Sequence, residues 1–85
     1  MKKDFSLISF LLRGKRRKAV LLSLNVPKPP KEIAKELKIS TSNVSNALIE
    51  LKKIDLVECI TEDAHFYRFY QLTQKGKDIL KQIKD

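Results

Sequence analysis

Three prolines stand within the four residues from Pro27 to Pro30, and this cluster limits how the chain can fold. Proline lacks a backbone N–H and cannot continue a helix, so helix-forming segments on its two sides must be separate. Pro30 itself suits the first turn of a new helix, where no backbone donor is needed. The sequence therefore predicts one helix that ends before the prolines and another that begins at Pro30.

Two short amphipathic helices are expected after the prolines. The first spans about Pro30–Leu37, and its buried side carries Ile33, Ala34 and Leu37. The second spans about residues 41–54, begins where Ser40 or Thr41 can cap it, and buries Val44, Ala47, Leu48 and Leu51. The short connection between them places Ile39 against the core. Two such helices joined by a tight turn predict a helix-turn-helix motif.

The other elements complete a domain that is mainly α with a small β-hairpin. The sequence predicts a helix over Lys15–Leu24, strands over Leu56–Thr61 and Phe66–Leu72 joined by a tip at Thr61–His65, and a last helix over Gln74–Ile83. Thr73 is placed to cap the last helix. The predicted order is helix, helix, helix, strand, strand, helix. Residues 1–14 form an N-terminal apolar and basic segment before a domain over residues 15–85.

The outer side of the predicted helix over residues 41–54 carries short polar groups. On a helical wheel Ser42, Asn46, Ile49 and Lys53 lie opposite the buried side. Short amide and hydroxyl groups permit close approach to base edges in the DNA major groove, and Ile can contact a thymine methyl. Capping alone would explain the polar residues up to Ser42, but not Ser45 and Asn46 one turn further on. The candidate base-contacting residues are Thr41, Ser42, Asn43, Ser45, Asn46 and Ile49.

All the excess positive charge lies in the first half of the chain. Residues 1–42 hold 11 Lys and Arg against 3 Asp and Glu, whereas residues 43–85 hold 7 of each. This asymmetry predicts a polyanionic partner, while a solubilising lysine-rich surface is the alternative. The basic run Arg13–Lys18 stands at a helix N-terminus, where the dipole disfavours cations, so we expect it to bind phosphate. The candidate phosphate contacts are Lys15, Arg16, Arg17, Lys28, Lys31, Lys35 and Lys53.

Other classes of function find little support in the sequence. With Cys59 as the only cysteine and His65 as the only histidine, an internal disulfide and a four-ligand structural zinc site are both excluded, and a reducing cytoplasm fits. The apolar run Phe5–Leu12 is much shorter than the roughly 20 residues of a membrane span, although a surface anchor stays an alternative. Without a glycine-rich phosphate loop or a nucleophile–base pair, we expect no enzyme, no cofactor and no small-molecule ligand.

Two parts of the sequence resemble winged helix-turn-helix transcriptional regulators of the MarR/ArsR-like type, particularly small archaeal ones. They are EIAKELKISTSNVSNALIELKKIDLVE and, after an aromatic-rich strand, LTQKGKDIL. The resemblance covers about Arg16–Ile83. It implies a recognition helix at Thr41–Ile54 and a DNA-binding wing around Thr61–Arg68, in which His65 and Arg68 are the cations.

The chain departs from the pattern of that family at a few positions. Lys38 replaces the glycine that is frequent in the turn, and Pro29 stands where Ser or Thr commonly caps the helix, so we expect that cap to be lost. The predicted wing tip carries Glu62 and Asp63, whose charges oppose contact with phosphate. Glu50 adds a carboxylate to the predicted recognition helix.

Aromatic residues occupy both faces of the predicted second strand, so something must cover the second face. The candidates are the N-terminal run Phe5–Leu12 and another subunit. Because helix-turn-helix dimers bind paired half-sites, we expect double-stranded DNA as the partner and a homodimer that uses the N-terminal segment, the last helix or both. The main interpretation is a sequence-specific transcriptional regulator. The alternatives are a winged-helix protein–protein interaction module and a non-specific architectural DNA binder.

Overall fold

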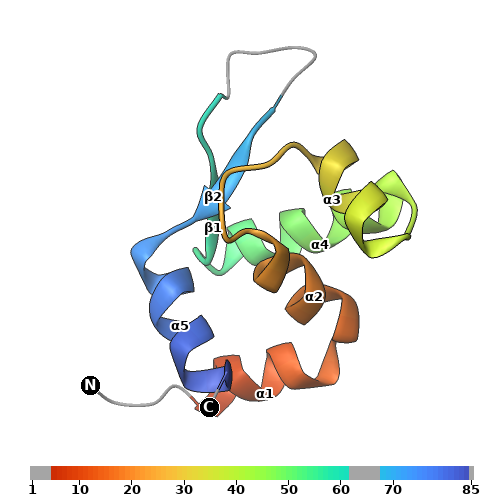
Figure 1. Cartoon of the computed structure of the whole chain (residues 1–85). Helices are drawn as coiled ribbons and strands as arrows, with labels where there is room; N and C mark the ends of the chain where they lie inside the picture. The colour runs from red at the N-terminus through yellow and green to blue at the C-terminus, as the bar shows by residue number, and fades with distance from the viewer. Residues whose placement is uncertain (1–4, 62–67, 85) are drawn as a thin grey trace.

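The structure, a computed structural model, describes residues 5–61 and 68–84, without the side chain of Lys84. Its elements are α1 (Phe5–Arg13), α2 (Lys15–Ser23), α3 (Pro30–Leu37), α4 (Thr41–Lys53), β1 (Val57–Cys59), β2 (Tyr70–Leu72) and α5 (Gln74–Lys84) (Figure 1). The predicted order of helix, helix, helix, strand, strand, helix is confirmed for α2 to α5. One further helix, α1, precedes it.

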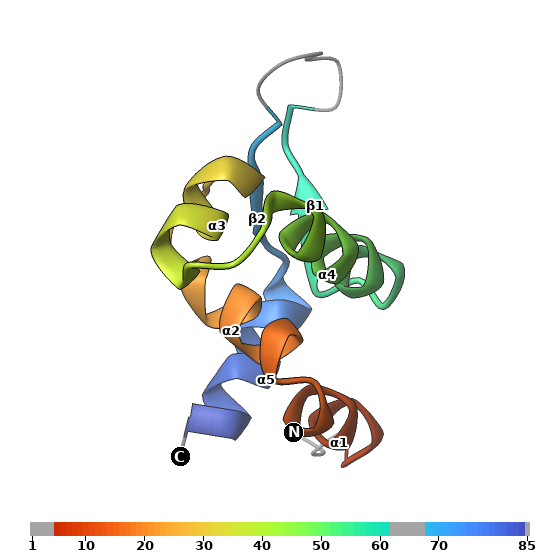
Figure 2. The ribbon, with the colours of Figure 1, turned by 90° about the vertical axis from the view of Figure 1, so that its right-hand side faces the viewer.

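Helices α2, α3 and α4 pack against one another around the core, with α5 and the hairpin beside them (Figure 2). The fully buried large side chains are Leu11, Val20, Leu21, Ile33, Val44, Leu48, Leu51, Leu56 and Val57. The predicted inward-facing residues of α3 and α4 all belong to this core or pack against it. The helical spacing of apolar residues was therefore sufficient to identify the buried side of these two helices.

Helix α1 was predicted only as an apolar and basic segment. It packs against α2 and α5, and Leu11 is completely buried in the common core. In both ribbon views α1 lies at the end of the molecule opposite the hairpin (Figures 1 and 2). The suggestion that Phe5–Leu12 covers the second face of the hairpin is therefore wrong, because the corner at Gly14 directs α1 towards α5.

The connection between α3 and α4 has the expected turn geometry. Lys38 ends α3 in the left-handed conformation, with φ of 58° and ψ of 43°. Ser40 caps α4, since its Oγ accepts a hydrogen bond from the Asn43 backbone N–H at 3.1 Å. Pro29 precedes α3 without a side-chain cap, as predicted, and Pro30 lies in the first turn. Lys38, Ser40 and Pro30 thus each mark a helix boundary.

The two strands form an antiparallel pair that is shorter than predicted. Val57 lies opposite Leu72, and Cys59 lies opposite Tyr70. On its other side Tyr70 exchanges two backbone hydrogen bonds with Lys28, with N···O distances of 2.9 and 3.0 Å. The loop after α2 therefore extends the sheet, and it fixes the base of the hairpin beside the helix-turn-helix.

Helix α5 is joined to the end of α4 through Thr73. The Thr73 hydroxyl accepts a hydrogen bond from the Gly76 N–H at 3.0 Å and donates one to the Asp55 carbonyl at 2.6 Å. The predicted cap is confirmed. Asp55, which follows the end of α4, takes the left-handed conformation with φ of 63°. A Cβ atom at Gly76 would collide with the Leu56 carbonyl oxygen. The glycine of LTQKG is thus required for close packing of α5.

Candidate nucleic-acid interface

Helix α4 presents the predicted polar side to solvent. Ser42, Asn46, Ile49 and Lys53 are all exposed, and 53% of the Ile49 surface is accessible. The opposite side of the helix is locked into the core. The expected orientation of the helix is therefore confirmed, and an apolar side chain is held in water among short polar groups.

The other candidate base-contacting residues lie at the edges of this outer side. Thr41 is exposed in the first turn, whereas Asn43 and Ser45 are half-buried on the two flanks. The helix N-terminus beside Thr41 has backbone N–H groups that no intrahelical acceptor satisfies, and such ends favour anions. The cap from Ser40 satisfies one of these donors. A phosphate near this end would meet the others.

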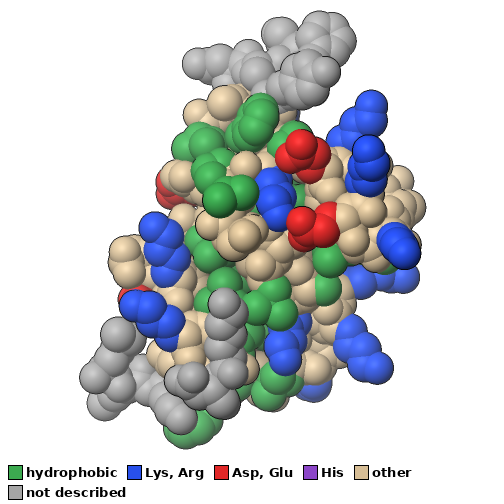
Figure 3. Space-filling model, viewed as in Figure 1, with side chains coloured by type: hydrophobic (Ala, Val, Ile, Leu, Met, Phe, Trp, Pro, Cys, Tyr) green, Lys and Arg blue, Asp and Glu red, His purple; other side chains and the backbone are tan. Residues whose placement is uncertain are grey.

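Exposed cations surround the helix-turn-helix. Among the predicted phosphate contacts, Lys15, Arg16, Lys31, Lys35 and Lys53 are exposed. In Figure 3, Lys and Arg side chains project along the right-hand edge, where α3 lies in Figure 1, and further down near α2. Lys38, which was not among the predicted phosphate contacts, is also exposed in the turn between α3 and α4. Its place in that turn is the signal that could have identified it.

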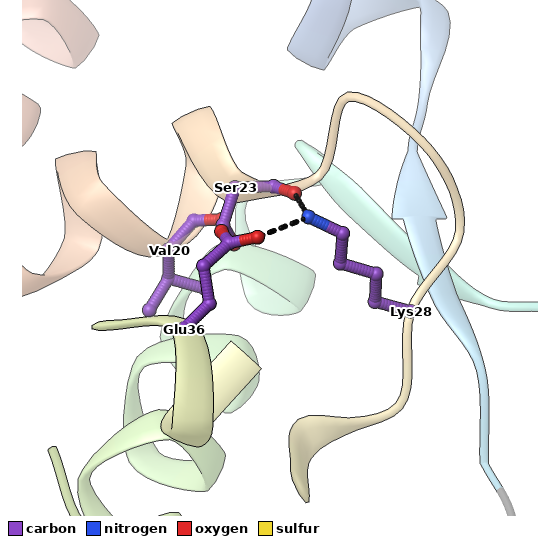
Figure 4. Close-up of polar contacts among 4 residues, drawn as sticks. All are labelled: Val20, Ser23, Lys28 and Glu36. Atoms are coloured by element: carbon purple, nitrogen blue, oxygen red, sulfur yellow. Dashed lines mark hydrogen bonds and ion pairs between the residues drawn. The ribbon is translucent and has the colours of Figure 1, made fainter. Parts of the chain in front are cut away.

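Lys28 is engaged within the molecule. Its ammonium donates to the Ser23 carbonyl at 2.6 Å and to Glu36 Oε1 at 2.8 Å, and only 14% of its side chain is accessible (Figure 4). The Ser23 hydroxyl in turn donates to the Val20 carbonyl at 2.7 Å. Lys28 therefore satisfies a carbonyl at the end of α2, where a cation is favourable. Its predicted contact with phosphate stays a prediction.

Arg17 also has partners within the molecule. Its Nε lies 2.8 Å from Glu50 Oε2, and its Nη1 donates to the Phe10 carbonyl at 3.0 Å. The guanidinium carbon stands 3.8 Å from the centre of the Phe10 ring. Glu50 places a negative charge on α4, as the sequence indicated, and this ion pair offsets it. No pattern within the sequence brings together residues that are so far apart in the chain.

The wing is described only at its base. Arg68 is exposed, and the Thr61 hydroxyl accepts a hydrogen bond from the Phe69 N–H at 2.8 Å. Glu62, Asp63 and His65 lie outside the described residues. The proposed cationic role of His65 and the effect of the acidic tip are therefore untested.

Two other features, a cluster of metal ligands and a membrane-spanning helix, are absent from the described part of the chain. Residues 5–61 and 68–84 contain no group of three or more His, Cys, Asp and Glu side chains that could hold a metal ion. Across the same ranges, every helix is too short or too polar to span a bilayer. Cys59 is a free thiol that is half-buried on β1. The interface around α4 is thus the arrangement with the clearest chemical use.

No protein-family model matches the chain, and no curated protein sequence matches it. Several solved structures, however, match the chain. Reduced YodB from B. subtilis gives a TM-score of 0.80 at 24% identity, over 99% of this chain and 85% of that chain. FabT from Streptococcus pneumoniae in complex with DNA gives 0.68 at 24% identity, over 82% of this chain and 50% of that chain.

A third match is the homodimeric winged helix-turn-helix DNA-binding domain Mb0332 from Mycobacterium bovis. Its TM-score is 0.70 at 22% identity, over 91% of this chain and 68% of that chain. Against several other matching structures the chain spans only 50% to 61% of the partner's length. At these identities the likeness concerns the fold, and the chain has the winged helix fold found in transcriptional regulators.

Proposed function

We propose that this protein is a transcriptional regulator that binds double-stranded DNA in a sequence-specific manner, with α4 in the major groove. The observation that carries the proposal is the exposed strip of Ser42, Asn46 and Ile49 on a helix whose other side is fixed in the core. Asn can bond adenine through two atoms, Ser suits several bases, and Ile fits a thymine methyl. Thr41, Asn43 and Ser45 are the adjoining candidates.

Phosphate contacts would hold α4 in register on the duplex. The exposed cations suited to this role are Lys15, Arg16, Lys31, Lys35, Lys38 and Lys53. Arg17 and Lys28 are left out, because their head groups already have partners. Arg68 and His65 of the wing would add contacts on the far side of the groove, against the opposing charges of Glu62 and Asp63.

We also propose a homodimer that uses α1 and α5. Phe5 and Leu12 are 74% and 54% exposed and lie on one side of α1 together with the half-buried Ile8. A second copy would cover this apolar side, which lies at the end of the molecule opposite the hairpin (Figures 1 and 2). The homodimeric state of the Mb0332 domain supports the proposal. Two copies could then read the paired half-sites of an operator.

The dimer can be tested by analytical ultracentrifugation. We expect Leu12→Glu to shift the wild-type dimer to monomer, because a charge would be buried in the contact. Ile60→Glu is the matched control, since Ile60 is 47% exposed on the hairpin at the other end of the molecule. A wild-type chain that is monomeric at every concentration would contradict this part of the proposal.

Selection of bound duplexes from a random pool, at near-physiological salt, tests the proposed function as a whole. Enrichment of a palindromic motif supports both specific binding and the dimer. Equal retention of unrelated duplexes would instead favour a non-specific architectural binder. Failure to retain any duplex at low salt would favour a protein–protein interaction module.

We further propose that the protein is a DNA-binding component of a reducing cytoplasm rather than an enzyme. Several of the structures it matches are described as transcriptional regulators, and the single half-buried thiol is compatible with such a compartment. We propose no cofactor and no small-molecule ligand. The particular likeness to small archaeal regulators rests on the sequence alone.

A further inference from the structure

One side chain, Arg17, joins three helices at the corner between α1 and α2. It belongs to α2, but its Nη1 donates to the Phe10 carbonyl in the last turn of α1. This carbonyl has no donor within α1, because the helix ends before the residue that would supply one. The following Gly14 N–H donates to Leu11 instead of Phe10. Arg17 thus caps the C-terminus of α1, and the cation also lies over the Phe10 ring.

The same guanidinium reaches the recognition helix. Its Nε donates to Glu50 Oε2 at 2.8 Å, and 28% of the Arg17 side chain and 43% of the Glu50 side chain are accessible. Glu50 lies on the flank of α4, between the buried side and the exposed side that carries Asn46. The pair therefore adds a fixed contact to the apolar packing of α4 on α2, at the edge of the surface proposed to meet DNA.

Gly14 provides the space that this arrangement needs. A Cβ atom at position 14 would lie 2.7 Å from Arg17 Nη1 and 2.9 Å from Arg17 Cδ. The backbone of Gly14 has φ of −107° and ψ of 91°, which any residue can adopt. The glycine is thus explained by the room it leaves for the arginine rather than by its conformation.

We propose that Arg17 positions the recognition helix, through Glu50, and does not bind DNA phosphate. This inference rests on the proposed function and gives one residue of the basic run a different role from its neighbour. Arg16 is exposed and would contact phosphate, whereas Arg17 holds α4 against the α1–α2 corner. A guanidinium suits the task because it bonds two acceptors at once in a planar fork, which an ammonium cannot reproduce.

The test compares variants of the full chain on the duplex that the wild type selects and on an unrelated duplex, over a range of salt concentrations. The variants are R17Q/E50Q, R17K, R16Q and R16K. Binding is measured by fluorescence anisotropy well below the lowest melting temperature, which thermal unfolding determines first. R17Q/E50Q removes one charge of each sign, so its net charge equals that of the wild type.

We expect R17Q/E50Q to keep the salt slope of the wild type and to lose about tenfold in preference for the selected duplex. A loss of this size lies within the range of interaction energies between residues in contact. R17K should lose preference as well, because Lys keeps the charge but not the fork. R16Q should keep the preference, while the slope of log K against log salt falls by about 0.9 for the lost phosphate contact. R16K should match the wild type.

Two results would overturn the inference alone. One is a salt slope in R17Q/E50Q that falls as in R16Q, which would make Arg17 a phosphate contact. The other is an unchanged preference in R17Q/E50Q and R17K, which would limit the pair to stabilising the fold. A wild-type chain that selects no duplex would contradict the proposed function and this inference with it.

Discussion

The two sides of α4 follow different physical rules. On the inner side Val44, Leu48 and Leu51 are at most 1% accessible, and they fix the helix against α2 and α3. On the outer side Asn46 and Ile49 are exposed and contribute little to the core. The inner side of α4 thus stabilises the fold, whereas the outer side is proposed to recognise DNA. Substitutions on the inner side should change the free energy of unfolding, and substitutions on the outer side should change DNA binding.

The largest effect is expected on the inner side. Leu51→Ala should lower the free energy of unfolding by about 2–5 kcal/mol, because it removes a fully buried side chain and leaves a cavity. Urea unfolding followed by circular dichroism measures the change. Below the transition, the folded fraction of the variant should retain the duplex preference of the wild type. A large loss of preference in that folded fraction would show that the two sides are not separable.

A smaller effect, of a different kind, is expected on the outer side. Asn46→Ala should weaken binding to the selected duplex by about 1–3 kcal/mol and relax the preference at one base pair. The free energy of unfolding should stay within about 0.5 kcal/mol of the wild type, since Asn46 is exposed and Ala is a better helix former. Titration against the selected duplex and its single-base variants gives both values. Unchanged affinities would reject α4 as the recognition helix.

Much of the fold could be predicted because local rules decided it. Pro30 begins α3, Ser40 caps α4, and Thr73 caps α5, and each effect depends on residues close in the chain. The exposed side of α4 followed from helical spacing in the same way. The orientation of the candidate base-contacting side could therefore be predicted, whereas its contact with DNA stays a prediction.

The partners of long charged side chains could not be predicted in this way. Arg17 was selected for phosphate because a cation at the start of α2 is disfavoured, but its head group reaches the end of α1, where a cation is favoured. Lys28 likewise caps the end of α2. The helical state of Phe5–Arg13 was missed because the segment is short and gains its stability from packing on α2 and α5.

The smallest effect concerns the two left-handed residues that bracket α4. Lys38→Gly and Asp55→Gly should each raise the free energy of unfolding by about 0.5 kcal/mol. Glycine relieves roughly 1 kcal/mol of left-handed strain in the folded state, but part of this gain is lost because glycine also gives the unfolded chain more conformational freedom. The two variants serve as controls for each other in DNA binding.

Lys38 is exposed in the turn beside the start of α4, whereas Asp55 follows the end of α4 and touches the start of α5 through its carbonyl. Lys38→Gly should therefore also lower the salt slope of DNA binding by up to about 0.9, the value for one phosphate contact, while Asp55→Gly should not. A slope in Lys38→Gly equal to that of the wild type would remove Lys38 from the interface. A steeper slope in Asp55→Gly would mean that the far end of α4 also lies close to DNA, because the lost carboxylate would no longer repel phosphate.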